Sequence, residues 1–317
     1  MTRTECAQWL RAHDRYLILS HSRPDGDTVG SAAALCLGLR KAGKQAYVLE
    51  NEDITEKYSD LFRNLTISGA EKDMTVVSVD VAAPHMLPKS ARELLPRLEL
   101  RIDHHFSFEA AFTPLSLVDA NAAACGEIIH DILIEMGVAL DQAIAEALYT
   151  AIATDTGCFR FANTTAHTHE VAADCAKTGL DLYPINQRLF DTNAISKLRL
   201  QGWIAENTRF FEGGRFAVCA LPRAVEQALG VREDDMENLS GFTRSIAGVL
   251  MAATLREGAD GRVKLSMRSV PGYDSSAVCE AFGGGGHKGA SGATIDLPLE
   301  QAAQAVAEVM LRVGVPV

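Results

Sequence analysis

The sequence predicts an α/β protein with two domains: a parallel β-sheet flanked by helices on both faces, followed by a smaller α/β domain. Short apolar runs alternate with helix-like stretches through the first half of the chain, which is typical of a parallel sheet. A mostly helical stretch follows over residues 124–212, and after it a new set of apolar runs begins. The length of 317 residues also favours two hydrophobic cores over one.

The strands of the first domain are predicted from five short apolar runs, which cover residues 15–20, 46–50, 75–80, 98–103 and 115–119. Between the first two runs, residues 30–43 have the composition of a buried helix that ends at Gly43. Two more helices are predicted over 125–137 and 141–155, because their apolar residues recur at three- and four-residue spacing.

The second domain is predicted to begin near residue 213. The expected division of the chain is an N-terminal domain, a linker helix and a C-terminal domain, over 1–185, 186–212 and 213–317. The elements predicted after the linker are two antiparallel strands around a turn (247–257 and 262–269), a helix (273–282), a strand (293–297) and a final helix (298–314).

Composition narrows the class of protein. No apolar run reaches the roughly 18 residues of a membrane helix, and the polar N-terminus is unlike a secretion signal. The seven cysteines form no Cys-x-x-Cys pair, which argues against a disulfide framework or a thiolate zinc site and favours a reducing cytoplasm. The net charge of −11 disfavours a protein that grips long duplex DNA. A phosphate-containing substrate is therefore expected to be short and held by metal ions.

Titratable side chains follow three of the predicted strands and one predicted helix. They are His21, Asp25, Asp27, Asp80, Asp103, His104, His105 and Asp155. Taken singly, each has a structural interpretation as a helix cap, a turn residue or a solvated strand end. The carboxyl ends of parallel strands meet at one edge of the sheet, however, so most of these side chains are expected to converge there. Carboxylates gathered in this way repel one another unless cations neutralise them. Mixed Asp and His ligands in this number favour two first-row divalent ions such as Mn²⁺.

These residues lie in motifs that resemble a known family. The stretches "HSRPDGD", "VSVD", "DHH" and "ATDTG" resemble, in order, the four motifs of the DHH phosphoesterase superfamily, and "FGGGGHKGASG" (282–292) resembles the glycine-rich motif of the DHH-associated C-terminal domain. The compact layout resembles the NrnA type, whose members hydrolyse very short oligoribonucleotides and often 3′-phosphoadenosine 5′-phosphate. The resemblance implies an active site in the cleft between the two domains.

The resemblance also implies a role for each motif residue. One metal ion is expected to be bound by His21, Asp25 and Asp80, and the other by Asp27, Asp80, His104 and Asp155. Asp80 is then the bridging ligand. Two catalytic positions follow: Asp103 is expected to orient a histidine, and His105 to face the scissile phosphate. The residues implied to bind substrate phosphate are Arg268, Gly285, Gly286 and His287.

Some of these residues also have independent physical interpretations. The glycines of 283–286 leave backbone N–H groups accessible to an anion, although the same run is compatible with a plain loop. Arg268 alternates with apolar residues, so it is also compatible with a solvated strand face. The stretch "HTHE" (167–170) has metal-like spacing, but we interpret it as the polar surface of a helix.

The expected activity is that of a cytoplasmic, Mn²⁺-dependent phosphodiesterase and phosphomonoesterase. The expected substrates are nano-RNA, linear dinucleotides such as pGpG and pApA, and 3′-phosphoadenosine 5′-phosphate. Three alternatives stay open: a RecJ-like single-strand exonuclease, a DHH pyrophosphatase and a non-catalytic nucleotide sensor. RecJ exonucleases carry additional nucleic-acid-binding parts, for which this chain has no room. DHH pyrophosphatases have a different C-terminal domain. A non-catalytic sensor is expected to lack metal ligands in at least one motif, and none is missing here. A homodimer is expected from the resemblance alone, and no membrane partner is expected.

Overall fold

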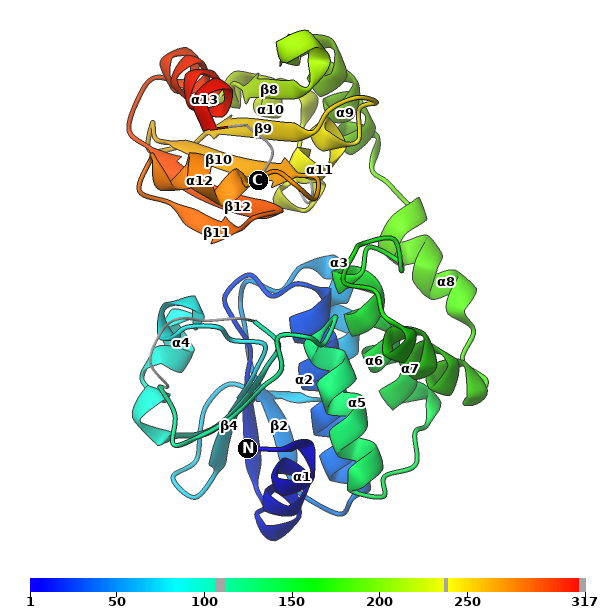
Figure 1. Cartoon of the computed structure of the whole chain (residues 1–317). Helices are drawn as coiled ribbons and strands as arrows, with labels where there is room; N and C mark the ends of the chain where they lie inside the picture. The colour runs from blue at the N-terminus through cyan, green and yellow to red at the C-terminus, as the bar shows by residue number, and fades with distance from the viewer. Residues whose placement is uncertain (106–111, 237–238, 314–317) are drawn as a thin grey trace. The chain divides into compact units, whose positions relative to one another are not determined.

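The computed structural model describes residues 1–105, 112–236 and 239–313. The chain divides into two compact units, Met1–Thr192 and Asn193–Val317, whose elements are labelled in Figure 1. Within the described part of the chain, no helix combines the length and apolar character needed to cross a membrane.

The first unit is built on a six-stranded sheet in which every neighbouring pair is parallel. The order of the strands is β3-β2-β1-β4-β5-β6. Their bounds are β1 Tyr16–Leu19, β2 Ala46–Leu49, β3 Thr66–Ile67, β4 Thr75–Val79, β5 Leu98–Asp103 and β6 Leu115–Val118. The predicted parallel sheet is confirmed. Strand β3 was not predicted, because two residues are too few to form a recognisable apolar run.

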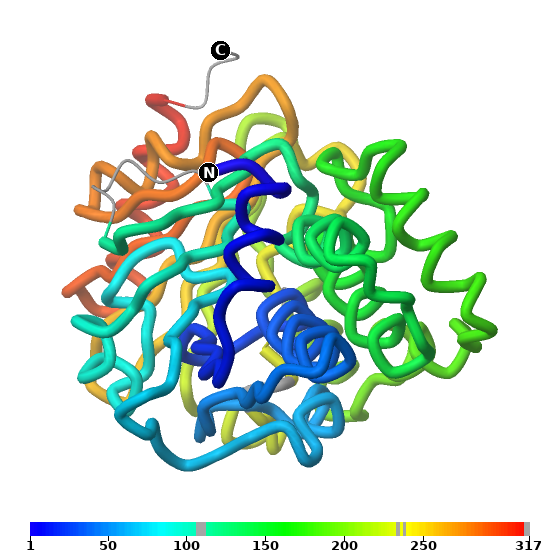
Figure 2. Tube along the Cα trace, turned by 90° about the horizontal axis from the view of Figure 1, so that it is seen from below, coloured from blue at the N-terminus to red at the C-terminus, as the bar shows by residue number. Residues whose placement is uncertain are grey.

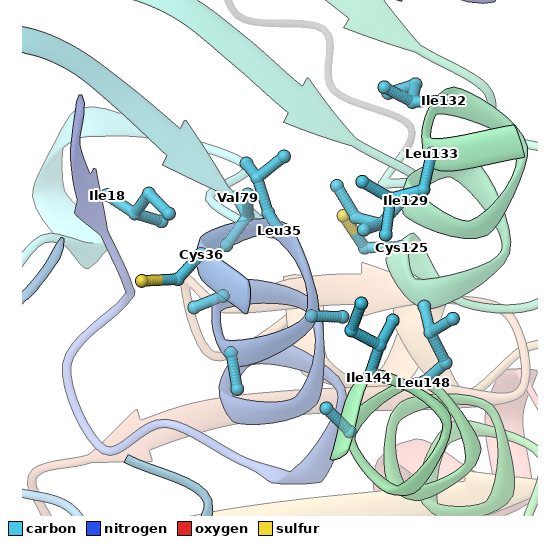
Figure 3. Packing of buried hydrophobic residues seen from close by; sticks show 14 of the residues in the cluster. Ile18, Leu35, Cys36, Val79, Cys125, Ile129, Ile132, Leu133, Ile144 and Leu148 are labelled. Atoms are coloured by element: carbon cyan, nitrogen blue, oxygen red, sulfur yellow. The ribbon is translucent and has the colours of Figure 1, made fainter. Parts of the chain in front are cut away.

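Helices cover both faces of this sheet. Consecutive residues of a strand point to opposite faces, and both sets are apolar here, so both faces need covering. Ile18 and Val79 belong to a core shared with α2, α5 and α6, and Figure 3 shows this packing. On the other face, Leu17 and Leu19 pack in a second core with Ala91 of the short helix α4. Figure 1 shows α4 in cyan and the α5 and α6 helices in green on opposite sides of the strands, and in Figure 2 the cyan and green segments again lie on opposite sides.

The helices of the first unit are α1 Arg3–Ala12, α2 Gly26–Lys41, α3 Glu56–Ser59, α4 Lys89–Arg92, α5 Cys125–Glu135, α6 Gln142–Asp155, α7 Ala166–Lys177 and α8 Leu182–Asn186. The helix predicted from residue 30 begins four residues earlier, so that expected start was wrong. The carboxylate of Asp25 accepts a hydrogen bond from the backbone N–H of Thr28 and caps the helix. The predicted turn at Asp25 is therefore the first turn of α2.

Helix α2 crosses α6 at very short range because its facing residues are small. A Cβ atom at Gly30 would lie only 2.4 Å from the carbonyl oxygen of Ala147 and 2.8 Å from the backbone nitrogen of Ala151. The contact is therefore backbone to backbone, and no larger residue fits without separating the helices. This crossing holds the first turn of α2, with Asp25 and Asp27, beside the last turn of α6, which ends at Asp155.

The second unit contains a mixed sheet with the order β11-β12-β10-β9-β8-β7. Only β8 and β9 pair in parallel among these strands. The strands are β7 Arg209–Phe211, β8 Phe216–Leu221, β9 Met251–Glu257, β10 Val263–Ser269, β11 Gly285–His287 and β12 Ala290–Ile295. The helices are α9 Ile195–Asn207, α10 Arg223–Leu229, α11 Leu239–Arg244, α12 Ser275–Glu280 and α13 Leu299–Val313.

The antiparallel pair of β9 and β10 and the helices α12 and α13 confirm the predicted smaller α/β unit. The glycine run is not a plain loop, because Gly285, Gly286 and His287 form the edge strand β11 against β12. Gly286 has φ of 142°, and a Cβ there would lie 2.7 Å from the carbonyl oxygen of Ala290. A glycine is therefore required for β11 to approach its neighbour.

Candidate metal centre

The carboxyl ends of three neighbouring strands carry the polar cluster that the sequence predicts. His21 follows β1, Asp80 follows β4, and Asp103 ends β5. Since β1, β4 and β5 are adjacent and parallel, these positions lie at one edge of the sheet. Helices α2 and α6 add Asp27 and Asp155 to the same place.

The side chains form two groups that share Asp80. In the first group, Nε2 of His21 lies 3.8 Å from Oδ2 of Asp80 and 3.9 Å from Oδ1 of Asp25. In the second group, Nε2 of His104 lies 3.6 Å from Oδ1 of Asp80. The same nitrogen lies 3.6 Å from Oδ2 of Asp27 and 3.4 Å from Oδ2 of Asp155. One oxygen of Asp80 therefore faces each group, as a bridging carboxylate requires.

Both histidines are oriented by a backbone carbonyl. Nδ1 of His21 lies 2.8 Å from the carbonyl oxygen of Ser22, and Nδ1 of His104 lies 3.2 Å from that of Ala122. A carbonyl oxygen can only accept, so Nδ1 carries the proton in each ring. The lone pair of Nε2 then points at the carboxylates, which is the usual arrangement of a metal-binding histidine.

Asp27 is fixed by donors from a distant part of the chain. The backbone N–H groups of Cys125 and Gly126, at the start of α5, donate to its two oxygens at 2.7 and 3.0 Å. The hydroxyl of Ser31 donates to Oδ1 at 2.9 Å. Sequence reasoning missed all three donors, and the only signal was that Cys125 starts a helix near a motif. Asp27 is only 1% exposed, and these three hydrogen bonds replace the contacts with water that its carboxylate loses on burial.

Asp80 occupies a strained backbone position in the middle of the cluster. Its φ is +56°, which a non-glycine residue seldom adopts. The hydroxyl of Thr28 donates to Oδ2, whereas the buried Oδ1 accepts no hydrogen bond. An unsatisfied carboxylate oxygen at this depth is costly, and a cation is the partner that fits it.

The charge balance of the cluster also fits cations. Burial, together with the charge of Asp80, raises the pKa of Asp27 well above its usual range. Burial, with Asp25 and Asp80, raises the pKa of Asp155 in the same direction. Burial opposes ionisation of Asp80 too, but His105, His104 and His21 lower its pKa to about 2. The donors present therefore fit two divalent metal ions, which would allow all the carboxylates to ionise together.

His105 belongs to a separate hydrogen-bonded chain. Its Nδ1 lies 2.9 Å from Oδ1 of Asp103 and 3.2 Å from Oδ1 of Asp80. The other oxygen of Asp103 accepts from Nε of Arg101 at 3.0 Å and from its Nη2. Arg101 is 4% exposed and also lies over the ring of Phe112. Sequence reasoning missed Arg101, although a charged residue inside an apolar strand was a signal.

The candidate phosphate-binding residues of the second unit lie in one row of its sheet. Arg268 of β10 pairs with Ala290 of β12, and Ala290 pairs with His287 of β11. Directly opposed residues point to the same face, so Arg268 and His287 share a face at a separation of about 10 Å, two strand spacings. Gly285, Gly286 and His287 are exposed, and burial lowers the pKa of Arg268.

Comparison with known proteins agrees with both units. Residues 15–152 match the family model described as DHH family, N-terminal domain, and residues 214–313 match the DHHA1 domain. A protein of Thermus thermophilus named bifunctional oligoribonuclease and PAP phosphatase NrnA is 33% identical over 309 residues, which cover 94% of this chain and 90% of that protein. The Bacillus subtilis protein of the same name is 27% identical over 301 residues, covering 92% and 93%.

Solved structures show the same fold. An exopolyphosphatase-related protein from Bacteroides fragilis superposes with a TM-score of 0.87 at 21% identity, over 98% of this chain and 96% of that one. RecJ of Thermus thermophilus in complex with Mn²⁺ gives a TM-score of 0.57 at 14% identity, over 99% of this chain and 55% of RecJ. The two matching domains, the relative at 33% identity and the shared-carboxylate cluster lead to one conclusion. The chain belongs to the DHH family of metal-dependent phosphoesterases, with a DHHA1 domain as its second unit.

Proposed function

We propose that this enzyme hydrolyses short oligoribonucleotides to mononucleotides and removes the 3′-phosphate of 3′-phosphoadenosine 5′-phosphate. The observation that carries the proposal is the pair of ligand groups that share Asp80. The relatives named oligoribonuclease and PAP phosphatase support the substrate class. The linear dinucleotides pGpG and pApA are included in that class.

The chain supplies the ligands that phosphoester hydrolysis needs. His21 and Asp25 hold one position, Asp27, His104 and Asp155 hold the other, and Asp80 belongs to both. Bound there, two divalent ions, which we propose to be Mn²⁺, supply water activation and charge neutralisation at the leaving oxygen.

His105 contributes a fixed positive charge beside this centre. Burial alone would lower its pKa, but the hydrogen bond to Asp103 and the nearby carboxylate of Asp80 raise the pKa of His105 to about 11. In the metal-free protein the imidazole is therefore protonated at neutral pH, with Nδ1 held by Asp103. Its Nε2–H is then available to donate to a non-bridging phosphate oxygen, where negative charge grows during the reaction.

The second unit is proposed to bind a phosphate of the substrate away from the reacting bond. Arg268 and His287 share a sheet face, and the exposed N–H groups of Gly285 and Gly286 lie in the same edge strand as His287. A clamp of this kind positions the scissile bond without taking part in the chemistry. The net charge of −11 is consistent with short substrates, since a long polyanion would be repelled.

The location and assembly of the enzyme remain proposals as well. All seven cysteines are free, which is consistent with a cytoplasmic enzyme. A homodimer stays a prediction, and sedimentation equilibrium of the purified protein tests it.

The test of the proposed function is time-resolved product analysis with Mn²⁺. The substrates are pGpG, a five-nucleotide RNA, 3′-phosphoadenosine 5′-phosphate, a long single-stranded DNA and pyrophosphate. We expect mononucleotides from the two RNAs and AMP from the bisphosphate, at rates well above those for the other two. Preferential cleavage of long DNA or pyrophosphate would support the RecJ-like or pyrophosphatase alternative. Binding without turnover of any substrate would support the nucleotide sensor.

A further inference from the structure

A second cluster of metal-ligating side chains lies apart from the candidate metal centre. His130 and Asp131 are adjacent in α5, and His167 lies in the first turn of α7. Oδ1 of Asp131 lies 3.1 Å from Nδ1 of His130 and 3.1 Å from Nε2 of His167. His130 is 5% exposed, so the cluster is partly enclosed by the fold.

The spacing of these three atoms suits a common metal ion. Ligands bonded at about 2.0–2.2 Å to one ion lie roughly 3–3.5 Å from each other. Both measured separations from Asp131 fall in this range, and one atom from each of the three residues lies within 4.8 Å of the others. Two imidazoles and a carboxylate form the donor set that proteins use for Zn²⁺ and similar ions.

Each histidine of the cluster has a carboxylate at its other ring nitrogen. Nε2 of His130 lies 3.3 Å from Oδ2 of Asp174, and Nδ1 of His167 lies 3.4 Å from Oε2 of Glu170. A carboxylate hydrogen-bonded behind the imidazole is the usual support of a metal-ligating histidine, since it orients the ring and raises its basicity. His167 has such a hydrogen bond, to Glu170. Nε2 of His130 faces Asp174 without a hydrogen bond.

The charged groups around the cluster carry an excess of negative charge, which favours binding of a cation. Arg3 pairs with Asp131, with Nε 2.8 Å from Oδ2, and its Nη2 lies 2.8 Å from Asp119. Lys177 pairs with Asp174 at 2.8 Å. The surrounding carboxylates nevertheless outnumber these two cations; they are Asp119, Asp131, Glu170 and Asp174.

We propose that His130, Asp131 and His167 bind one divalent first-row transition metal ion, for which Zn²⁺ is the probe. The ion ties α5 to the start of α7 and leaves the remaining coordination positions to water. Residues 156–165 separate Asp155 from α7, so the site fixes the far end of the segment that follows a ligand of the candidate metal centre. His169, the second histidine of the "HTHE" stretch, is not part of the site: it is exposed and stacks on Phe159 at 5.2 Å between ring centroids.

The experiment counts zinc ions per full-length chain by native mass spectrometry, after titration with Zn²⁺ alone. The variants are His167→Ala and the matched control His169→Ala, which removes a histidine from the same helix. We expect His167→Ala to bind one zinc ion fewer than the wild type, and His169→Ala to bind the same number. Hydrolysis with Mn²⁺ should be unchanged in both variants.

The same pair of variants in an Asp80→Asn background separates this site from the candidate metal centre. The proposal requires His167→Ala to lose one zinc ion in that background too. Equal counts in His167→Ala and His169→Ala, or a loss that disappears with Asp80→Asn, would overturn it. Thermal unfolding in EDTA checks that the variants are folded. His167→Gln, which keeps a polar side chain of similar reach, replaces His167→Ala if the alanine variant does not fold.

Discussion

Nδ1 of His105 lies 2.9 Å from Oδ1 of Asp103, and the same oxygen also accepts the backbone N–H of His105 at 3.0 Å. Arg101 holds the other oxygen of Asp103 from within the same strand. The ring of His105 is therefore positioned by a chain of charged residues that begins in the sheet. That arrangement makes Arg101 a positioning residue, since it acts on the proposed substrate-facing imidazole through Asp103.

Replacing Arg101 with lysine tests this chain. Lysine keeps the charge but cannot reproduce the two contacts that Nε and Nη2 make with Asp103. We expect kcat to fall about 10- to 100-fold, the range for residues that support a reacting group, with little change in metal affinity. Arg97→Lys is the control, because Arg97, just before β5, donates to the backbone carbonyls of the segment that precedes β4, among them those of Glu71 and Met74. Unchanged kcat in Arg101→Lys, or an equal loss in the control, would contradict the positioning role.

Gly30→Ala tests the close crossing of α2 and α6. The new Cβ meets backbone atoms of Ala147 and Ala151, so the helices must move apart. We expect a loss of about 1–3 kcal/mol in the free energy of unfolding and weaker metal binding, because Asp27 and Asp155 separate. The control is Gly202→Ala in the exposed part of α9, where a Cβ meets no atom within 4 Å. It should raise stability by up to about 1 kcal/mol. Urea unfolding of both variants measures the difference, and equal stabilities would contradict the account.

Arg268→Ala tests the phosphate clamp. If Arg268 binds a remote phosphate, its loss weakens binding of substrate and transition state equally. We expect KM for pGpG to rise about 10- to 100-fold, corresponding to a charged hydrogen bond of about 1.5–3 kcal/mol, with kcat nearly unchanged. Lys264→Ala, four residues earlier on β10 and on the same face, removes a positive charge as a control. A fall in kcat with unchanged KM would show that Arg268 has another role.

The pH dependence of metal-induced stability follows from Asp27 and Asp155. Their pKa values are raised by burial and neighbouring carboxylates, so the folded metal-free protein holds protons that the unfolded chain releases above about pH 4. Their contribution to stability is full below that pH and is lost as the pH rises towards the raised values. Metal binding requires the ionised forms.

We therefore expect the difference in Tm between samples with Mn²⁺ and with EDTA to grow from about pH 5 to about pH 7.5. The pKa of Asp80, lowered to about 2, keeps that group ionised throughout this range. Calorimetric scans across the range measure the difference. A difference that stays constant or shrinks with pH would be inconsistent with proton release from the two carboxylates.

The sequence was sufficient to predict which side chains lie together at the candidate metal centre. Asp80 and Asp103 follow apolar runs, and parallel strands bring such ends to one edge. Helix starts were less predictable: Asp25 has the properties of both a turn residue and a cap, and the structure makes it the cap of α2.

Contacts between distant segments could not be predicted from local patterns. The N–H groups of Cys125 and Gly126 reach Asp27 across 98 and 99 residues, and only the packing of α5 against α2 brings them together. The cluster of His130, Asp131 and His167 was missed for the same reason. His167 was considered beside His169 along the chain, whereas its neighbours in space come from α5.

The most direct test of the central claim, that Asp80 is shared between two metal positions, is the number of Mn²⁺ ions bound per chain by Asp80→Asn. Asparagine tolerates the left-handed backbone at this position, so the fold should persist. The account predicts fewer bound ions than in the wild type and a fall in pGpG hydrolysis of at least about 100-fold, with an unchanged circular dichroism spectrum. Two tightly bound Mn²⁺ ions and near-normal turnover in Asp80→Asn would contradict it.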